Sequence, residues 1–302
     1  MQQREWYSGF VRSTLVITAL LVSACGGVPN STPDASLPNE TPDASVTNST
    51  SDAGVPPRCT VTPDAVTCEA RITTLTAGTA TRDVYWQTPT TPPPPAGYPV
   101  VLVYQGSFFA PSSTWGTVAI DTPFNGYQQA RLQALLLEHG FTVIAPSAAV
   151  GLAWQTNSGL PWDATTDQPF IDALFASITR GDFGPADMSR WYATGISSGG
   201  YMTSRMALSY AGRFRALAIN SGSWATCAGA ACILPATLPA DHPPTLFLHG
   251  RRDLTVPLFT AETYAKKLSD DGFTSELVID DDASHEWLTV APERLTTWFE
   301  SH

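Results

Sequence analysis

The chain has 302 residues, of which 43% are hydrophobic and only 14% are charged, and its formal net charge is −11 at pH 7. Because an average soluble domain carries about 25% charged residues, this chain can bury a sizeable core but must cover its surface largely with uncharged polar residues. The acidic balance and the lack of clustered lysine and arginine exclude nucleic acid as a partner and favour a neutral substrate.

Residues 1–24 are predicted to be an export signal. Arg4 and Arg12 flank its start, and the apolar run 15–22 is too short to span a membrane. The segment Leu21–Cys25 resembles the lipobox of bacterial lipoprotein precursors, which implies cleavage before Cys25 and a lipid anchor on its thiol. An ordinary cleaved signal peptide that leaves Cys25 unused is the alternative. We therefore expect an exported protein, either an outer-membrane or cell-surface lipoprotein held to the membrane at Cys25 or a secreted protein.

Residues 25–57 are predicted to form a linker after the lipidated cysteine. Thr32–Ser36 recurs at 41–45 as the same five residues, among many further Pro, Ser, Thr and Asp. Such a tract lacks the apolar residues that would offset its ordering entropy, so we expect it to stay extended. The remaining residues, 58–302, have the length of one α/β domain.

Four cysteines remain when Cys25 is set aside, namely Cys59, Cys68, Cys227 and Cys232. An even number in an exported chain favours two disulfides, and local pairing, Cys59 with Cys68 and Cys227 with Cys232, is the simplest of the three connectivities. Their spacing resembles no zinc ligand set, and neither a metal nor an organic cofactor is expected.

Strands and helices alternate along the domain. The first strands are expected at 66–72 and 82–87, paired antiparallel at a sheet edge, and the unbroken apolar run 99–104 is typical of a parallel strand buried on both faces. The later elements are predicted as strands at 141–146, 191–194, 215–222, 245–250 and 275–280, and as helices at 126–139, 168–180, 201–208, 259–272 and 291–301. This order predicts a mostly parallel central sheet with helices on both faces, the α/β class.

A candidate nucleophile lies between the strand at 191–194 and the helix at 201–208. The segment Gly195–Gly199 fits the pattern G-x-S-x-G, with Ser197 at its centre. Strand, sharp turn and helix are the context that a nucleophile elbow requires, and the glycines allow strand and helix to pass closely. The pattern therefore predicts that Ser197 is a catalytic serine.

A serine nucleophile needs a base and an orienting acid. His285 follows the strand at 275–280, and Asp253 follows the strand at 245–250. Sites of parallel sheets form at the carboxyl ends of the strands, and the chain order Ser, Asp, His is that of the α/β-hydrolases. We predict a catalytic triad of Ser197, Asp253 and His285.

Acyl transfer also needs N–H donors for the oxyanion. The backbone of Ser198, directly after the nucleophile, is one candidate, and the backbone of Ser107, in the loop after the strand at 99–104, is the other. Whether Gln105 orients that loop or only bonds locally is open.

The segment Gly195–Tyr201, followed by Thr203–Met206, resembles the serine box of extracellular medium-chain-length polyhydroxyalkanoate depolymerases, and the similarity extends over most of residues 98–300. The resemblance implies the α/β-hydrolase fold and cleavage of a carboxylic ester through an acyl-enzyme, with a polyester or a small ester as substrate. Related boxes occur in feruloyl and acetyl-xylan esterases, which remain the alternative specificity. A catalytically silent hydrolase-fold lipoprotein that binds at the cell surface is a further alternative.

Aromatic side chains lie in loops near the predicted strand ends. An aromatic rim would suit an apolar acyl chain. The candidates for substrate binding are Trp287, Phe108, Trp224 and Trp154, although each of them could instead pack its loop onto the core.

Overall fold

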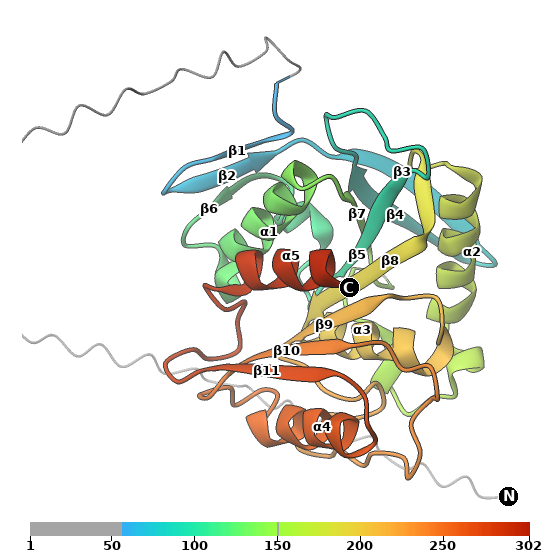
Figure 1. Cartoon of the computed structure of the whole chain (residues 1–302), viewed down its shortest axis with the longest axis vertical. Helices are drawn as coiled ribbons and strands as arrows, with labels where there is room; N and C mark the ends of the chain where they lie inside the picture. Colours follow the sequence, from blue (N-terminus) through green and yellow to red (C-terminus); the bar gives the residue numbers. More distant parts are fainter. Residues whose placement is uncertain (1–55, 150) are drawn as a thin grey trace, which may run out of the picture. The chain divides into compact units, whose positions relative to one another are not determined.

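The computed structural model describes residues 56–149 and 151–302. The predicted signal peptide, Cys25 and the linker up to residue 55 lie outside the described residues. The described part of the chain is built around an eight-stranded sheet with strand order β11-β10-β9-β8-β5-β7-β4-β3 (Figure 1). Its strands are β3 (Arg71–Ala77), β4 (Ala80–Gln87), β5 (Tyr98–Tyr104), β7 (Thr142–Pro146), β8 (Ala186–Ile196), β9 (Ala216–Asn220), β10 (Thr245–Gly250) and β11 (Ser275–Asp280).

The sheet is mostly parallel, as predicted. All neighbouring pairs from β11 to β7 run parallel, and only β4 and β3 are added antiparallel at one edge. The carboxyl ends of β5, β8, β10 and β11 therefore lie at the same end of the sheet. This end receives the loops that carry the predicted site residues.

The expected strand at 66–72 is wrong, because two strands of two different sheets occupy this stretch. β2 (Ala65–Cys68) lies between β1 (Cys59–Val61) and β6 (Gly116–Ala119) in a small antiparallel sheet, whereas β3 pairs with β4 in the main sheet. The Cys59–Cys68 disulfide joins β1 to β2. The alternating sequence pattern runs through both strands and does not reveal the change of partner.

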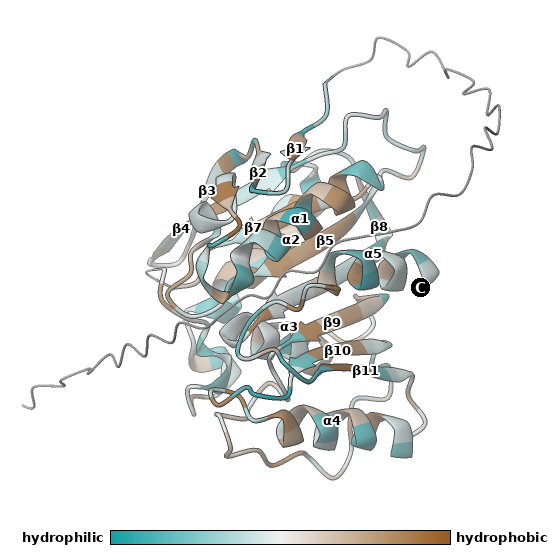
Figure 2. Cartoon of the chain, turned by 90° about the vertical axis from the view of Figure 1, so that its left-hand side faces the viewer, coloured by the Kyte–Doolittle hydropathy of each residue, from teal (hydrophilic) through white to brown (hydrophobic). Residues whose placement is uncertain are grey.

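Helices cover both faces of the sheet, also as predicted. Val101 and Val103 of β5 pack in one core with α1 (Gly126–Glu138) and α5 (Ala291–Ser301). The alternate residues of β5 face the opposite core, which includes side chains of α2 (Asp167–Arg180) and α3 (Ser198–Ser209), and α4 (Leu258–Asp270) packs on that same face near β10. All seven residues of β5 are buried. Figure 2 shows the same strand as a hydrophobic ribbon between the layers.

Short 3-10 helices lie in the loops of the described part. They are η1 (Pro111–Ser113), η2 (Pro123–Asn125), η3 (Gln155–Asn157) and η4 (Trp162–Ala164).

Residues 56–302, as far as the structure describes them, contain two disulfides, Cys59–Cys68 and Cys227–Cys232, which is the local pairing that the sequence predicted. Among the described residues, the helices are all too short or too polar to cross a membrane.

Candidate active site

Ser197 lies on a sharp turn between β8 and α3, as expected of a nucleophile elbow. Its backbone has φ 57° and ψ −121°, a conformation that costs a non-glycine residue about 1–3 kcal/mol. The flanking glycines allow the turn, since a Cβ on Gly195 would lie 2.6 Å from the carbonyl oxygens of Gly199 and Tyr104. The Ser197 N–H donates to the Asn220 carbonyl of β9 at 3.1 Å, which fixes the turn to the sheet.

Asp253 is buried in the loop after β10 and accepts hydrogen bonds at both carboxylate oxygens. Its Oδ1 accepts the N–H groups of Thr255 at 2.9 Å and Val256 at 2.8 Å, and its Oδ2 lies 2.8 Å from His285 Nδ1. Burial alone would raise the pKa of Asp253, but the neighbouring N–H groups of His249, His285 and Val256 outweigh burial and hold this pKa well below its usual range. The carboxylate is therefore ionised at neutral pH.

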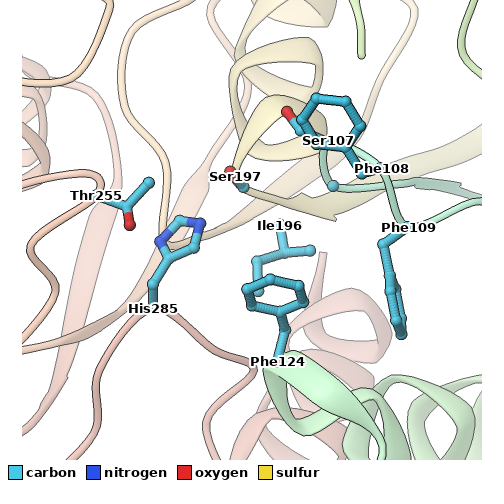
Figure 3. A pocket seen from close by; sticks show the side chains of 9 residues that line it. Ser107, Phe108, Phe109, Phe124, Ile196, Ser197, Thr255 and His285 are labelled. Atoms are coloured by element: carbon cyan, nitrogen blue, oxygen red, sulfur yellow. The ribbon is translucent and has the colours of Figure 1, made fainter. Parts of the chain in front are cut away.

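His285 lies between Asp253 and Ser197. Because its Nδ1 is bonded to the carboxylate, its Nε2 is left for the pocket, and the ring faces the Ser197 side chain (Figure 3). The structure thus brings the three residues of the predicted triad to one place from β8, β10 and β11. A hydroxyl, an imidazole and a carboxylate are the three groups that a serine nucleophile, its base and an orienting acid would supply.

A second histidine, which the sequence reasoning missed, lies beside the same carboxylate. His249 of β10 is fully buried, and its Nε2 is 2.8 Å from the Val256 carbonyl oxygen and 3.4 Å from Asp253 Oδ2. Since a carbonyl oxygen can only accept, Nε2 carries the proton. His249 thus holds the turn that presents Asp253. The sequence contained one indication of this role, because His249 ends a buried strand and stands four residues before Asp253.

The loop after β5 passes beside the nucleophile. A Cβ on Gly106 would lie 3.7 Å from the Ser197 Cβ, and no hydrogen bond within residues 56–149 and 151–302 uses the backbone N–H of Ser107. The N–H of Ser198 is in the first turn of α3, where helical N–H groups have no acceptor within the helix. Two backbone donors are therefore available near Ser197.

Gln105 anchors this loop, which answers the question that its sequence left open. The buried side chain accepts the Ala148 N–H at 2.9 Å and donates to the Gly151 carbonyl at 3.1 Å. Its own carbonyl accepts the Trp154 indole N–H at 3.2 Å. Gln105 therefore ties the loop that contains Ser107 to the loop after β7.

The site opens into a largely apolar cavity of about 370 Å³. Its lining residues are Gly106, Ser107, Phe108, Phe109, Phe124, Ile196, Ser197, Thr255 and His285 (Figure 3). Phe124 packs edge-on against Phe109, with ring centroids 5.9 Å apart, and against the His285 ring at 6.2 Å. The sequence reasoning missed Phe124 as a site residue, because η2 comes far before His285 in the chain.

Three of the four predicted substrate-binding aromatics do not line this cavity. Trp154, Trp224 and Trp287 are all at most 2% exposed, and only Phe108 lies in the cavity wall. The Trp287 indole N–H donates to Gln129 of α1, and Trp224 packs edge-on against Tyr264 of α4. These tryptophans fasten loops to the core, where their large rings bury more surface than they would at a rim.

The fold and the site geometry define the class of the protein as an α/β-hydrolase. No protein-family model matches the chain. A putative dienelactone hydrolase from Klebsiella pneumoniae superposes with a TM-score of 0.53 at 19% identity, over 78% of this chain and 99% of that one. Esterase 2 of Thermogutta terrifontis gives a TM-score of 0.53 at 13% identity, over 77% and 92% of the two chains. The acylaminoacyl peptidase of Pyrococcus horikoshii also gives 0.53, at 14% identity over 77% of this chain, which spans only 40% of that longer peptidase.

A sequence relative places the chain more narrowly. A poly(3-hydroxyoctanoate) depolymerase from Pseudomonas fluorescens is 46% identical over 250 residues, which cover 82% of this chain and 89% of the relative. The chain belongs to the family of this depolymerase. The resemblance to polyhydroxyalkanoate depolymerases, which was inferred from the segment Gly195–Tyr201, is therefore confirmed.

Proposed function

We propose that this protein is a serine hydrolase that cleaves the ester bonds of medium-chain polyhydroxyalkanoates. The observation that carries the proposal is the placement of Ser197 on a strained elbow, facing the hydrogen-bonded His285–Asp253 pair in an apolar cavity. The 46% identical depolymerase supports the substrate class.

In the proposed reaction, Ser197 Oγ attacks the ester carbonyl carbon while His285 Nε2 accepts its proton. Asp253 holds the imidazole by its Nδ1–H, so that Nε2 is the basic nitrogen, and stabilises the imidazolium that forms. The N–H groups of Ser107 and Ser198 donate to the oxyanion of the tetrahedral intermediate. His285 then gives the proton to the departing alcohol.

A second half-reaction releases the acid. Water enters the cavity, His285 accepts its proton, and the hydroxide attacks the acyl-enzyme carbonyl. The second tetrahedral intermediate then collapses: its bond to Ser197 Oγ breaks, His285 returns the proton to Oγ, and the carboxylic acid leaves. The apolar rings of Phe109 and Phe124 would accommodate the alkyl side chain of the hydroxyacid during both steps.

We also propose that residues 58–302 are the catalytic domain of an exported protein with a lipid anchor at Cys25. The two disulfides support export, since such bonds persist in oxidising compartments. We expect mass spectrometry of the purified mature protein to find a diacylglyceryl thioether on Cys25 as the N-terminal residue. An N-terminus further along the chain, without lipid, would contradict the anchor.

The proposed activity is tested by replacing the nucleophile. Ser197→Ala should lower kcat for p-nitrophenyl octanoate by at least about 10⁴-fold and abolish clearing of a polyhydroxyoctanoate suspension. A fluorophosphonate probe should label the unsubstituted protein at Ser197. The matched control is Ser189→Ala, which removes a hydroxyl from the opposite end of the same strand β8.

The outcomes separate the alternatives. Substantial residual turnover in Ser197→Ala would overturn the serine mechanism. Activity restricted to short soluble or feruloyl esters would keep the triad and replace the polyester by a small ester. Absence of both labelling and turnover in the folded protein would favour a binding role.

A further inference from the structure

Exposed apolar side chains lie in the wall of the active-site cavity and on the segments that adjoin this wall. Phe108 is 79% exposed and Phe124 is 48% exposed, and both line the cavity. Leu254 is 95% exposed and lies between Asp253 and the cavity residue Thr255. Leu152 is 47% exposed, and its carbonyl accepts the Phe108 N–H at 2.6 Å. We call these four residues, Phe108, Phe124, Leu152 and Leu254, the apolar rim.

Two members of the rim are held in an unfavourable backbone conformation. Phe108 has φ 61° and Phe124 has φ 56°, in the left-handed region that disfavours bulky side chains. The surrounding structure fixes both. The Phe108 N–H is bonded to Leu152, and the Phe124 carbonyl accepts the Trp287 N–H at 3.0 Å while Asn125 Nδ2 donates to the Trp287 carbonyl at 2.8 Å.

For Phe108, the strained backbone and the exposure of the ring are a cost that burial does not offset. A fully buried phenylalanine gains roughly 1.5–3 kcal/mol from leaving water, and Phe108 keeps little of this gain. A single exposed apolar side chain needs no explanation, but exposed apolar side chains that line or adjoin one cavity are of the kind that marks binding. Phe108 and Phe124 line the same cavity as Ser197 (Figure 3).

We propose that the apolar rim docks the enzyme onto the surface of a solid aliphatic polyester with pendant alkyl chains. This inference rests on the proposed function and adds the surface by which an insoluble substrate is held. The side chains of the rim are uncharged, as such a polymer is. The net charge of −11 opposes adsorption to anionic membranes or polyanions.

The rim also sets the position of the chemistry relative to the surface. Phe108 directly follows Ser107, the proposed oxyanion donor. A Phe108 ring embedded among the alkyl chains therefore places the nearest polymer ester close to Ser107 and to the cavity mouth. Leu254 makes the same kind of contact beside the Asp253 loop.

The test measures adsorption separately from hydrolysis. All adsorption variants carry Ser197→Ala, so that the polymer is not consumed. Phe108→Asn removes the ring but keeps a residue that tolerates the left-handed backbone, and Leu254→Ser removes an almost fully exposed side chain. The matched control is Ile72→Ser on β3, the strand at the far edge of the main sheet, where Ile72 is 55% exposed.

We expect the double variant Phe108→Asn with Leu254→Ser to bind polyhydroxyoctanoate particles at least tenfold more weakly in a depletion assay, and Ile72→Ser to bind within about twofold of the parent. In the protein that retains Ser197, Leu254→Ser should lower the ratio of polymer clearing to p-nitrophenyl acetate turnover at least fivefold.

The remaining outcomes overturn the inference in distinct ways. Unchanged adsorption of the rim variants, or an equal loss in Ile72→Ser, would overturn the docking surface while the proposed function stands. A parent that neither adsorbs to nor clears the polymer would overturn the proposed function, and the docking surface with it. Rim-dependent binding to phosphatidylcholine vesicles without binding to the polyester would assign the rim to a membrane instead.

Discussion

Asp253 shows how single side chains build the proposed machinery. Its carboxylate accepts two backbone N–H groups at one oxygen and the His285 Nδ1–H at the other, so that its position and its charge are both fixed. The low pKa of Asp253 follows from these donors. An uncharged amide at this position could not accept from all of them.

We therefore expect Asp253→Asn to lower kcat for soluble esters by roughly 10³–10⁴-fold, because the amide would favour the wrong imidazole tautomer. Steady-state kinetics with p-nitrophenyl octanoate measures the loss. Asp282→Asn is the matched control, since this aspartate lies near His285 in the chain but has a side chain that is 87% exposed. A loss of less than tenfold in a folded Asp253→Asn protein would remove Asp253 from the triad.

The meeting of three predicted site residues at one end of the sheet could be foreseen from their places along the chain. Ser197, Asp253 and His285 each follow a recognisable strand, and parallel strands bring their carboxyl ends together. The aromatic residues of the cavity wall were predicted less well, since an aromatic residue in a loop can turn inward or outward with the same sequence signal. The tertiary packing of Trp154 and Trp287 decides this, and no local pattern contains it.

At the scale of elements, buried central strands were the most predictable. The run 99–104 became β5 and the run 245–250 became β10, because a strand covered on both faces must be largely apolar and must end where polar loop residues begin. The small sheet of β1, β2 and β6 was not predicted. Its strands are three or four residues long, and β2 meets its partner β6 across some fifty residues of chain, so the pairing leaves no local pattern.

The left-handed turn at Phe124 and Asn125 was not predicted for the same reason, because its partners are far away in the chain. This turn is held by two hydrogen bonds to the backbone of Trp287, which is more than a hundred and sixty residues away in sequence. Because both bonds are non-local, the turn and the cavity wall it forms become visible only in the fold.

At the scale of the whole molecule, stability depends on a buried histidine that takes no part in the site. His242 precedes β10 and is 5% exposed, with Nδ1 2.9 Å from the Pro243 carbonyl oxygen and Nε2 2.7 Å from the Tyr264 hydroxyl of α4. In the neutral ring, Nδ1–H donates to the carbonyl and Nε2 accepts from the hydroxyl. Burial lowers the pKa of His242 from 6.5 to about 4.

This shift predicts the sign of the pH dependence. Between the two pKa values the unfolded chain binds a proton at His242 that the folded protein does not, so the free energy of unfolding falls as the pH is lowered from about 6.5 towards 4. At roughly 1.4 kcal/mol per unit, the loss between pH 7 and pH 4.5 is about 2–3 kcal/mol from this residue alone. His242→Gln keeps a side chain that can donate and accept but does not titrate.

Urea unfolding of the wild type and of His242→Gln at pH 7 and at about pH 4.5 measures how much unfolding free energy each protein loses on acidification. The variant should start with lower stability at pH 7, because its contacts are imperfect, but should lose about 2–3 kcal/mol less than the wild type on acidification. An equal loss in the wild type and in His242→Gln would show that other groups, and not the buried imidazole, make the domain sensitive to acid.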